Sequence, residues 1–320
     1  MRILVTGGAG FIGSHYVQAL LSEPMAAAEE LSVTVLDSLT YAGNRRNLDS
    51  VRSLPGFRFV AGDIADASLA DRLLAEHDEV VHFAAESHVD RSISAAAPFV
   101  HTNVAGTQTL LDAAVRHGIR VFVQVSTDEV YGSIPSGSWT EDAPLAPNSP
   151  YAASKAAADL LALAYHRTHG LDVRITRCSN NYGPRQHPEK VIPLFVTSLL
   201  RGESVPLYGD GRNVRDWLHV ADHCQGAELV RTGGRAGEIY HIGGGCELTN
   251  AELTDRLLGL LGADRSRVRR VPDRKGHDRR YSLDWRKIHR ELGYKPRHQF
   301  GEGLADTVSW YRDHPGWWDR

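Results

Sequence analysis

Tyr151 and Lys155 are the first residues of this chain whose types and spacing point to chemistry. They lie four positions apart at the start of a predicted helix, so both side chains share one helix face. A free tyrosine titrates with a pKa of about 10, and a neighbouring ammonium group should lower the pKa of Tyr151. Such a phenol could take a proton from a substrate hydroxyl while hydride leaves the same carbon. The pair therefore predicts proton transfer coupled to hydride transfer.

The run Thr127-Asp128-Glu129 places two adjacent carboxyl groups directly after a predicted buried strand. Two carboxyl groups held in different protonation states can divide acid and base work between them. The threonine hydroxyl could hydrogen-bond a substrate oxygen and stabilise charge there. Ligands of open parallel sheets bind at the carboxyl ends of central strands. We therefore expect a catalytic site here rather than a solvent-exposed loop end.

Three glycines spaced three apart, Gly7, Gly10 and Gly13, lie between the first predicted strand and the first predicted helix. A tight turn requires a residue that tolerates positive φ, and close approach of a diphosphate requires a residue without a side chain. The N-terminus of the following helix offers free N–H groups to that diphosphate. This placement predicts a dinucleotide-binding loop.

Two aspartates follow the next strands. Asp37 ends the second strand, where a carboxylate can accept two ribose hydroxyls and would repel a 2′-phosphate. This favours NAD over NADP. Asp63 follows the third strand and could contact the adenine edge or cap a helix, and both interpretations stay open.

Strands and helices alternate through the first half of the chain. Buried apolar runs predict strands at residues 2–6, 33–36, 57–61, 80–83, 120–125 and 173–176. Helical spacing of apolar residues predicts helices at about 14–21, 68–76, 99–117 and from 151 to near 170. The predicted fold class is therefore α/β, a Rossmann-type doubly wound parallel sheet.

The pattern loosens beyond Asn180, where prolines and glycines cluster. We expect an NAD-binding Rossmann domain over residues 1–181 and a smaller, mixed substrate-binding lobe over 182–320. Segments of about 216–245 should return to the sheet. An Ala-rich patch at 25–30 is predicted to be a surface connection.

The composition argues against several other classes of protein. A formal net charge of -3 gives no global basic field for nucleic acid. Three widely spaced cysteines contain no CxxC pair and favour a reducing, cytoplasmic setting. The histidines show no HExxH spacing, so we predict no metal site. No run approaches the roughly 18 apolar residues that a membrane span needs, so we predict no membrane partner.

Together these motifs resemble the extended short-chain dehydrogenase/reductase family and, more narrowly, the dTDP-glucose 4,6-dehydratases. The resemblance extends over essentially the whole chain. Beyond the glycine loop, it rests on five runs of residues: His82-Phe83-Ala84-Ala85-Glu86-Ser87-His88-Val89-Asp90-Arg91-Ser92, Ser126 to Gly132, Asn180-Asn181-Tyr182-Gly183-Pro184, His187-Pro188-Glu189-Lys190 and Arg274-Lys275-Gly276-His277-Asp278. Arg185-Gln186 departs from the family pattern, since relatives often carry an aromatic residue there.

This resemblance implies a reaction and a division of roles. Hydride leaves C4 of the sugar for NAD, water is eliminated across C5 and C6, and hydride returns to C6. Tyr151 takes the proton at C4, Glu129 is the base at C5 and Asp128 is the acid at C6. Lys155 could also hold the nicotinamide ribose. The cofactor is NAD, tightly bound and regenerated in each turnover.

The resemblance also implies two sets of binding residues. The cofactor set is Gly7, Gly10, Phe11, Ile12, Gly13, Asp37, Ser38, Leu39, Thr40, Asp63, Ile64, Phe83, Ala84, Ala85, Ser87, Thr102, Val125, Tyr151, Lys155 and Asn181. The substrate set is Ser87, Thr127, Asn180, Glu189, Lys190, Val191, Pro206, Leu207, Tyr208, Arg215, Asn250, Arg274 and His277.

Residue chemistry supports part of the substrate set. Arg215 and Arg274 can each fork onto a diphosphate, and Tyr208 can stack on a base. Pro206 could merely shape a wall, and Asn250 could be a helix N-cap instead.

Three alternative functions are compatible with parts of this pattern, and the family resemblance also implies an oligomeric state. A UDP-sugar 4-epimerase needs the Tyr-Lys pair but no adjacent acids, whereas a UDP-glucose 4,6-dehydratase differs only in the base that it recognises. An inactive NAD-sensing protein of this fold would have lost catalytic residues, and all are present. The family resemblance implies a homodimer that pairs through helices at about 99–117 and 151–169.

Overall fold

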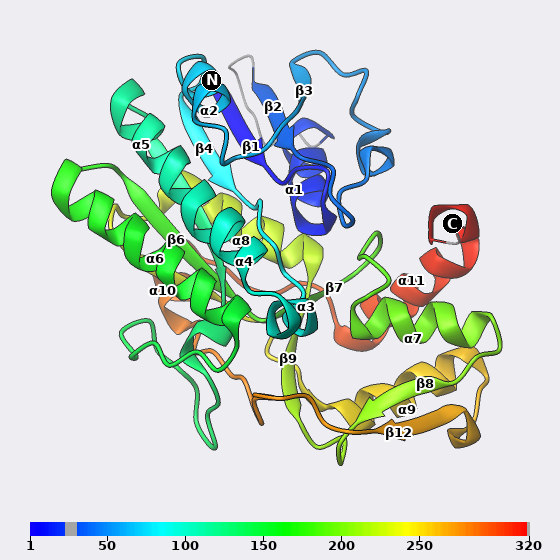
Figure 1. The fold of residues 1–320 in the computed structure, drawn as a ribbon. Helices are drawn as coiled ribbons and strands as arrows, with labels where there is room; N and C mark the ends of the chain where they lie inside the picture. Colours follow the sequence, from blue (N-terminus) through cyan, green and yellow to red (C-terminus); the bar gives the residue numbers. More distant parts are fainter. Residues whose placement is uncertain (23–30, 319–320) are drawn as a thin grey trace.

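The structure is a computed structural model that describes residues 1–22 and 31–318. The surface connection predicted at 25–30 lies outside these described residues. Seven strands form the central sheet: β1 (Arg2–Thr6), β2 (Ser32–Asp37), β3 (Phe57–Ala61), β4 (Glu79–His82), β5 (Val121–Thr127), β6 (Val173–Cys178) and β10 (Ile239–Ile242). Their order is β10-β6-β5-β4-β1-β2-β3, and every neighbouring pair is parallel. The predicted Rossmann-type fold is confirmed (Figure 1).

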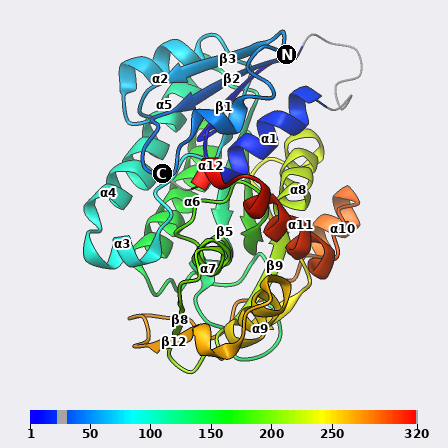
Figure 2. The same cartoon turned by 90° about the vertical axis from the view of Figure 1, so that its right-hand side faces the viewer.

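Helices cover both faces of this sheet, as its buried apolar strands require. The helices that pack on the two faces of the sheet are α1 (Phe11–Ser22), α2 (Ala67–Leu74), α5 (Thr107–His117), α6 (Pro150–His169) and α8 (Val220–Gly233). Figure 2 shows α1 and α8 side by side on one face and α2 and α5 on the other. Two hydrophobic cores result, one on each face of the sheet.

The segment predicted as one helix at 99–117 is not regular. It consists of α4 (Ala97–Phe99), a π-helical stretch at Val100–Gly106 and α5. Asn103 lies inside the π-helical stretch, and its amide donates to the Glu86 carbonyl at 3.0 Å and to Ser154 Oγ at 2.8 Å. A π-helical turn often occurs at functional sites. Here it lets one side chain tie the loop after β4 to α6.

Most of the remaining elements lie at the right and at the bottom of Figure 1. They include strands β7 (Asn180–Tyr182), β8 (Val205–Tyr208), β9 (Val214–His219), β11 (Glu247–Thr249) and β12 (Val268–Val271), with helices α7 (Val191–Leu200), α9 (Asn250–Leu261) and α11 (Phe300–Asp313). They enclose a third hydrophobic core. The short helices are α3 (Val89–Ser94), α10 (Arg286–Leu292) and α12 (Pro315–Trp318). The exact domain boundaries stay a prediction.

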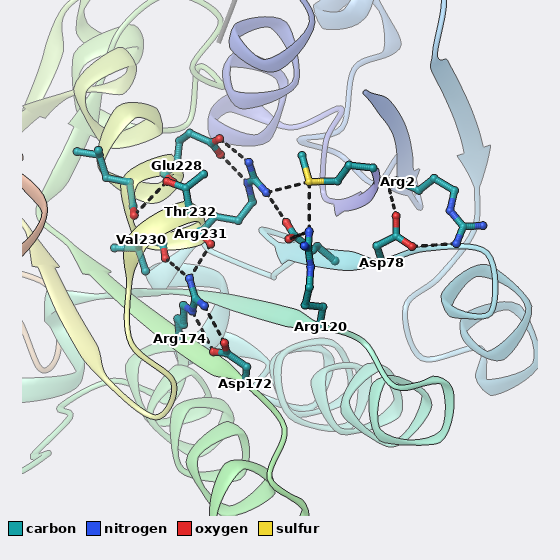
Figure 3. A network of polar contacts seen from close by, with 12 residues as sticks. Arg2, Asp78, Arg120, Asp172, Arg174, Glu228, Val230, Arg231 and Thr232 are labelled. Carbon is teal, nitrogen blue, oxygen red and sulfur yellow. Dashed lines mark hydrogen bonds and ion pairs between the residues drawn. The ribbon is translucent and has the colours of Figure 1, made fainter. Parts of the chain in front are cut away.

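Ion pairs collect at the amino ends of the central strands (Figure 3). Arg231 contacts both Glu79 and Glu228, and its distance to Glu228 Oε1 is 2.6 Å. Arg120 also contacts Glu79, whose side chain is only 4% exposed. Arg174 binds both oxygens of Asp172 at 2.9 and 2.7 Å. Buried carboxylates at this edge are therefore fully paired.

Candidate active site

A cavity of about 360 Å³ opens at the carboxyl ends of the central strands. This volume lies within the range of small-molecule sites. The loops after β1 to β6 all contribute to its wall. Of the predicted cofactor residues, all except Leu39 line it: Gly7, Gly10, Phe11, Ile12, Gly13, Asp37, Ser38, Thr40, Asp63, Ile64, Phe83, Ala84, Ala85, Ser87, Thr102, Val125, Tyr151, Lys155 and Asn181.

The glycine loop leaves room for close approach of a ligand. Gly7 has φ of 68°, and a Cβ there would lie 2.6 Å from the Ala84 nitrogen. A Cβ on Gly13 would collide with the Gly7 carbonyl, so glycine permits the tight packing of α1 on β1. The predicted positive φ is confirmed at Gly7, and Gly13 needs glycine for packing against the loop's own backbone. Close approach of a diphosphate stays a prediction.

Asp37 shapes the loops around it. Its oxygens accept hydrogen bonds from Ala9 N at 2.9 Å and Leu39 N at 2.8 Å. Burial raises the pKa of Asp37. Leu39 has φ of 51° and lies outside the cavity lining, although its backbone holds Asp37.

Asp63 does not cap a helix. Asp66 is the N-cap of α2 and accepts from Ser68 N and Leu69 N. Asp63 accepts from Ala65 N at 2.9 Å and lines the cavity. The capping interpretation is therefore wrong, whereas the cofactor interpretation stays a prediction.

Tyr151 and Lys155 lie in the first turns of α6. Ser149 caps this helix by accepting from Ala152 N at 3.1 Å, and Pro150 occupies its first position. Lys155 Nζ donates to the Val125 carbonyl at 2.7 Å, and burial lowers the pKa of Lys155.

The neighbouring ammonium group alone does not lower the pKa of Tyr151 in this structure. Burial raises the pKa of Tyr151 well above its usual value, and the carboxylates of Glu129 and Asp128 add to that rise. Desolvation and repulsion by nearby acids both disfavour the charged form of a buried phenol. Lowering this pKa requires a positive charge in the cavity.

Asp128 and Glu129 follow β5 in a short 3₁₀ turn, and Asp128 is 2% exposed. Thr127 Oγ1 donates to Asp128 Oδ1 at 3.2 Å and accepts from Glu129 N at 3.3 Å. Burial and the nearby Glu129 raise the pKa of Asp128 well above its usual value. Burial also raises the pKa of Glu129, but Arg215, Lys190 and Arg274 oppose that rise. Asp128 is therefore the better proton donor and Glu129 the better base.

The predicted substrate residues divide into two groups. Ser87, Thr127, Asn180, Glu189 and Lys190 line the cavity. The other predicted substrate residues lie beyond its lining: Val191, Pro206, Leu207, Tyr208, Arg215, Asn250, Arg274 and His277.

Protein groups hold both predicted phosphate-binding arginines in this structure. Arg274 pairs with Asp90 at 2.6 Å and lies over the Tyr208 ring at 5.5 Å. Arg215 donates to the Asp278 carbonyl at 2.9 Å. Both arginines oppose the rise of the Glu129 pKa, so they lie near Glu129.

Asn250 is not a helix N-cap. Thr249 caps α9 and forms a capping box with Glu252, and Asn250 is the first residue of the helix. The capping alternative for Asn250 is wrong.

Sequence reasoning missed several lining residues. They are Leu36, Ala42, Gly43, Gly62, Glu86, Ser126, Cys178, Ser179, Gln186 and His187. Five of them lie in a strand or directly after one, next to predicted residues, and that proximity was the available signal: Leu36, Gly62, Ser126, Cys178 and Ser179. The other five lie farther along their loops. Burial raises the pKa of the Cys178 thiol to about 12.

The departure at Arg185-Gln186 has a structural explanation. Arg185 adopts φ of 66° and donates to Gln18 Oε1 on α1 at 2.9 Å. Gln186 lines the cavity instead. The charged side chain therefore points to α1 while its neighbour shapes the site.

A glycine-rich loop after β1 and a Tyr-Lys pair on the helix after β5 define an extended short-chain dehydrogenase/reductase. Solved structures agree. A UDP-glucose 4-epimerase from Thermotoga maritima, with UDP-glucose, matches with a TM-score of 0.90 at 33% identity, over 98% of this chain and 100% of that chain.

The family model described as GDP-mannose 4,6 dehydratase matches residues 4–307, and the chain belongs to that family. A dTDP-glucose 4,6-dehydratase from Actinoplanes sp. is 65% identical over 99% of this chain and 100% of its own length. One from Streptomyces niveus is 61% identical over 100% of this chain and 95% of its own. The crystal structure of DesIV, a dTDP-glucose 4,6-dehydratase from Streptomyces venezuelae with NAD and TYD bound, matches with a TM-score of 0.97 at 68% identity, over 100% of this chain and 99% of that chain. The resemblance read from the motifs is confirmed.

Proposed function

We propose that this chain is an NAD-dependent dTDP-glucose 4,6-dehydratase, a hydro-lyase of deoxysugar biosynthesis. It converts dTDP-glucose to dTDP-4-keto-6-deoxyglucose and water. The observation that carries this proposal is the pair of adjacent acids after β5, of which Asp128 is buried and Glu129 is half-buried, with the pKa of Asp128 raised well above its usual value. Elimination of water needs a base and an acid at neighbouring carbons. The named function of full-length relatives at 61–65% identity supports the same reaction.

The residues of the cavity fit NAD. The bare backbone of the glycine loop, at the N-terminus of α1, suits a diphosphate, and Asp37 suits an unphosphorylated ribose. NAD, when bound, would supply the acceptor for the hydride from C4 of the sugar and the donor of that hydride to C6. The nicotinamide ring also brings the positive charge that would lower the pKa of Tyr151. The NAD in the DesIV structure supports this cofactor.

The chain's own residues divide the proton transfers. Tyr151 takes the C4 hydroxyl proton, while Thr127 hydrogen-bonds the C4 oxygen. Glu129 removes the proton from C5, which the adjacent 4-keto group has acidified, and C5 is reprotonated when hydride returns to C6. Asp128, whose raised pKa favours the protonated form, gives its proton to the departing C6 hydroxyl. Arg215 and Arg274 hold the diphosphate, and Tyr208 stacks on the base.

A direct assay tests this function. The purified protein is incubated with dTDP-glucose, and the 4-keto-6-deoxy product is detected by its ultraviolet absorbance in alkali. Product formation supports a dehydratase, and interconversion of C4 epimers without that absorbance supports an epimerase. A parallel incubation with UDP-glucose measures the preference for the base. A protein that binds NAD but changes neither substrate would be an inactive sensor.

The proposal includes a cytoplasmic homodimer. Val100 and Leu160 are large apolar side chains that are 55% and 58% exposed, and they lie on the two segments predicted to pair. Light scattering would test the dimer, and a monomer would exclude it. Among residues 1–22 and 31–318, the structure contains no helix with the length and apolar character of a membrane span.

A further inference from the structure

We infer that Asp159, two helical turns beyond Tyr151, is a positioning residue that keeps the ammonium group of Lys155 charged and in place. This inference deepens the proposed function. Only its turnover assay depends on that function, because the titration of Lys155 needs no substrate. Asp159 itself does not line the cavity.

The geometry of α6 brings Asp159 to Lys155. Tyr151, Lys155 and Asp159 follow one another at intervals of four residues, so they lie on one face of the helix. Side chains of a helix tilt toward its N-terminus, which directs Asp159 toward the turn that carries Lys155. Asp159 is 0% exposed and Lys155 is 4% exposed. Little water screens the two charges from each other.

Strand β5 holds both side chains at consecutive residues. Lys155 Nζ donates to the Val125 carbonyl at 2.7 Å. Ser126 Oγ donates to Asp159 Oδ2 at 3.0 Å. The two contacts fix α6 against the strand that ends in the catalytic acids.

Arg177 pairs with one oxygen of Asp159 and leaves the other oxygen unoccupied among the described residues. Arg177 Nε donates to Asp159 Oδ2 at 2.9 Å, and Arg177 also contacts the Tyr131 hydroxyl. Asp159 Oδ1 has no hydrogen-bond partner within the described part of the chain. A carboxylate paired at one oxygen retains negative charge that acts on its neighbours.

Two other titratable groups that interact with Lys155 are neutral at neutral pH. Cys178 on β6 has a pKa raised to about 12 by burial, and His82 on β4 has a pKa lowered to about 3 by burial. Neither group carries charge at neutral pH. Burial lowers the pKa of Lys155, and Asp159 is the largest influence that opposes this change. Asp159 therefore supplies the counter-charge that Lys155 needs.

A lysine titration tests the inference without substrate. The chain has five lysines, so ¹³Cε-lysine NMR gives few signals, and a Lys155→Met variant assigns the one of interest. The test variant is Asp159→Asn with Arg177→Met, because the single change would leave Arg177 buried and unpaired. We expect the pKa of Lys155 to fall by about one unit or more. Asp159→Asn alone, which keeps the side-chain size, serves if the double variant does not fold.

Asp172→Asn is the matched control. Asp172 pairs with Arg174 at the amino end of β6, whereas Arg177 lies near the carboxyl end of that strand. The control therefore also removes an Asp-Arg pair, but at the end of β6 away from Arg177 and Asp159. We expect the pKa of Lys155 to stay unchanged in the control. In turnover assays the Asp159 variants should lose at least about tenfold in kcat, and the alkaline limb of their pH profile should move to lower pH.

An unchanged Lys155 titration in both Asp159 variants would overturn the inference, as would an equal shift in the control. Because the titration needs no substrate, a protein without dehydratase activity still gives a result. Failure of the inference and failure of the proposed function therefore remain distinguishable.

Discussion

The two ends of the central sheet both bury carboxyl groups but differ in how these groups are paired. At the amino ends, Glu79 and Glu228 share Arg231, and Asp172 is held at both oxygens by Arg174 (Figure 3). At the carboxyl ends, Asp128 has one oxygen without a hydrogen-bond partner among the described residues. A buried charge without a partner is costly, so its proton becomes available for chemistry. Paired carboxylates maintain the fold, whereas unpaired ones are suited to react.

Glu129→Gln should give the largest effect on turnover. Loss of the C5 base should slow dehydration by about 100-fold to 10,000-fold. Partial reduction of NAD should remain detectable, because Tyr151 still acts at C4. Product assays and nicotinamide absorbance measure the two events, and unchanged turnover would remove Glu129 from the mechanism. The thermal stability of the variant should not fall, because pairing of the Glu129 carboxylate with other charges contributes little to the stability of the protein.

Glu79→Ala should give the largest effect on stability. Removing one partner of the buried cluster leaves Arg231 incompletely paired and should lower the free energy of unfolding by about 3–5 kcal/mol. Urea titration measures the loss, and kcat of the folded fraction should stay unchanged. Asp78→Ala is the control, because its pair with Arg2 at the same edge is exposed and should cost much less. Equal losses in the two variants would contradict the comparison.

Asp128 and Asp78 should respond to pH with opposite sign. Burial raises the pKa of Asp128, so folding becomes less favourable as the pH rises above the unfolded value of about 4. The hydrogen bond from Arg2 lowers the pKa of Asp78, so its stabilisation is present above that value and is lost as the pH falls through the folded pKa. Relative to the unsubstituted protein, Asp128→Asn should gain stability with rising pH, and Asp78→Asn should lose it. Denaturant titrations at several pH values measure both slopes, and slopes of the same sign would refute this prediction.

Arg215→Ala and Arg274→Ala should have the smallest effects. Each variant loses charged hydrogen bonds to the diphosphate, which should raise the KM for the nucleotide sugar about tenfold. Arg279→Ala is the control, because Arg279 pairs with Asp210 on the surface. No change of KM in either test variant would exclude the diphosphate role.

Local sequence signals predicted much of the fold and of the site. The glycine loop, Asp37 and the Tyr151-Lys155 pair are short motifs whose geometry follows from one strand and one helix. The direction of the Tyr151 pKa could not be predicted, because it depends on burial and on Glu129 from another element. Gln186 escaped prediction because its inward position depends on the left-handed backbone of Arg185.

The strand β10 has a consequence for synthesis of the protein. It pairs with β6 at the edge of the sheet, yet it follows β6 only after the strands β7 to β9 and the helices α7 and α8. A nascent chain that ends before Ile239 leaves the backbone N–H and C=O groups of β6 unpaired on that side. Growing chains therefore expose an aggregation-prone edge until that segment has left the ribosome. Chaperones would find their binding site on this enzyme at β6.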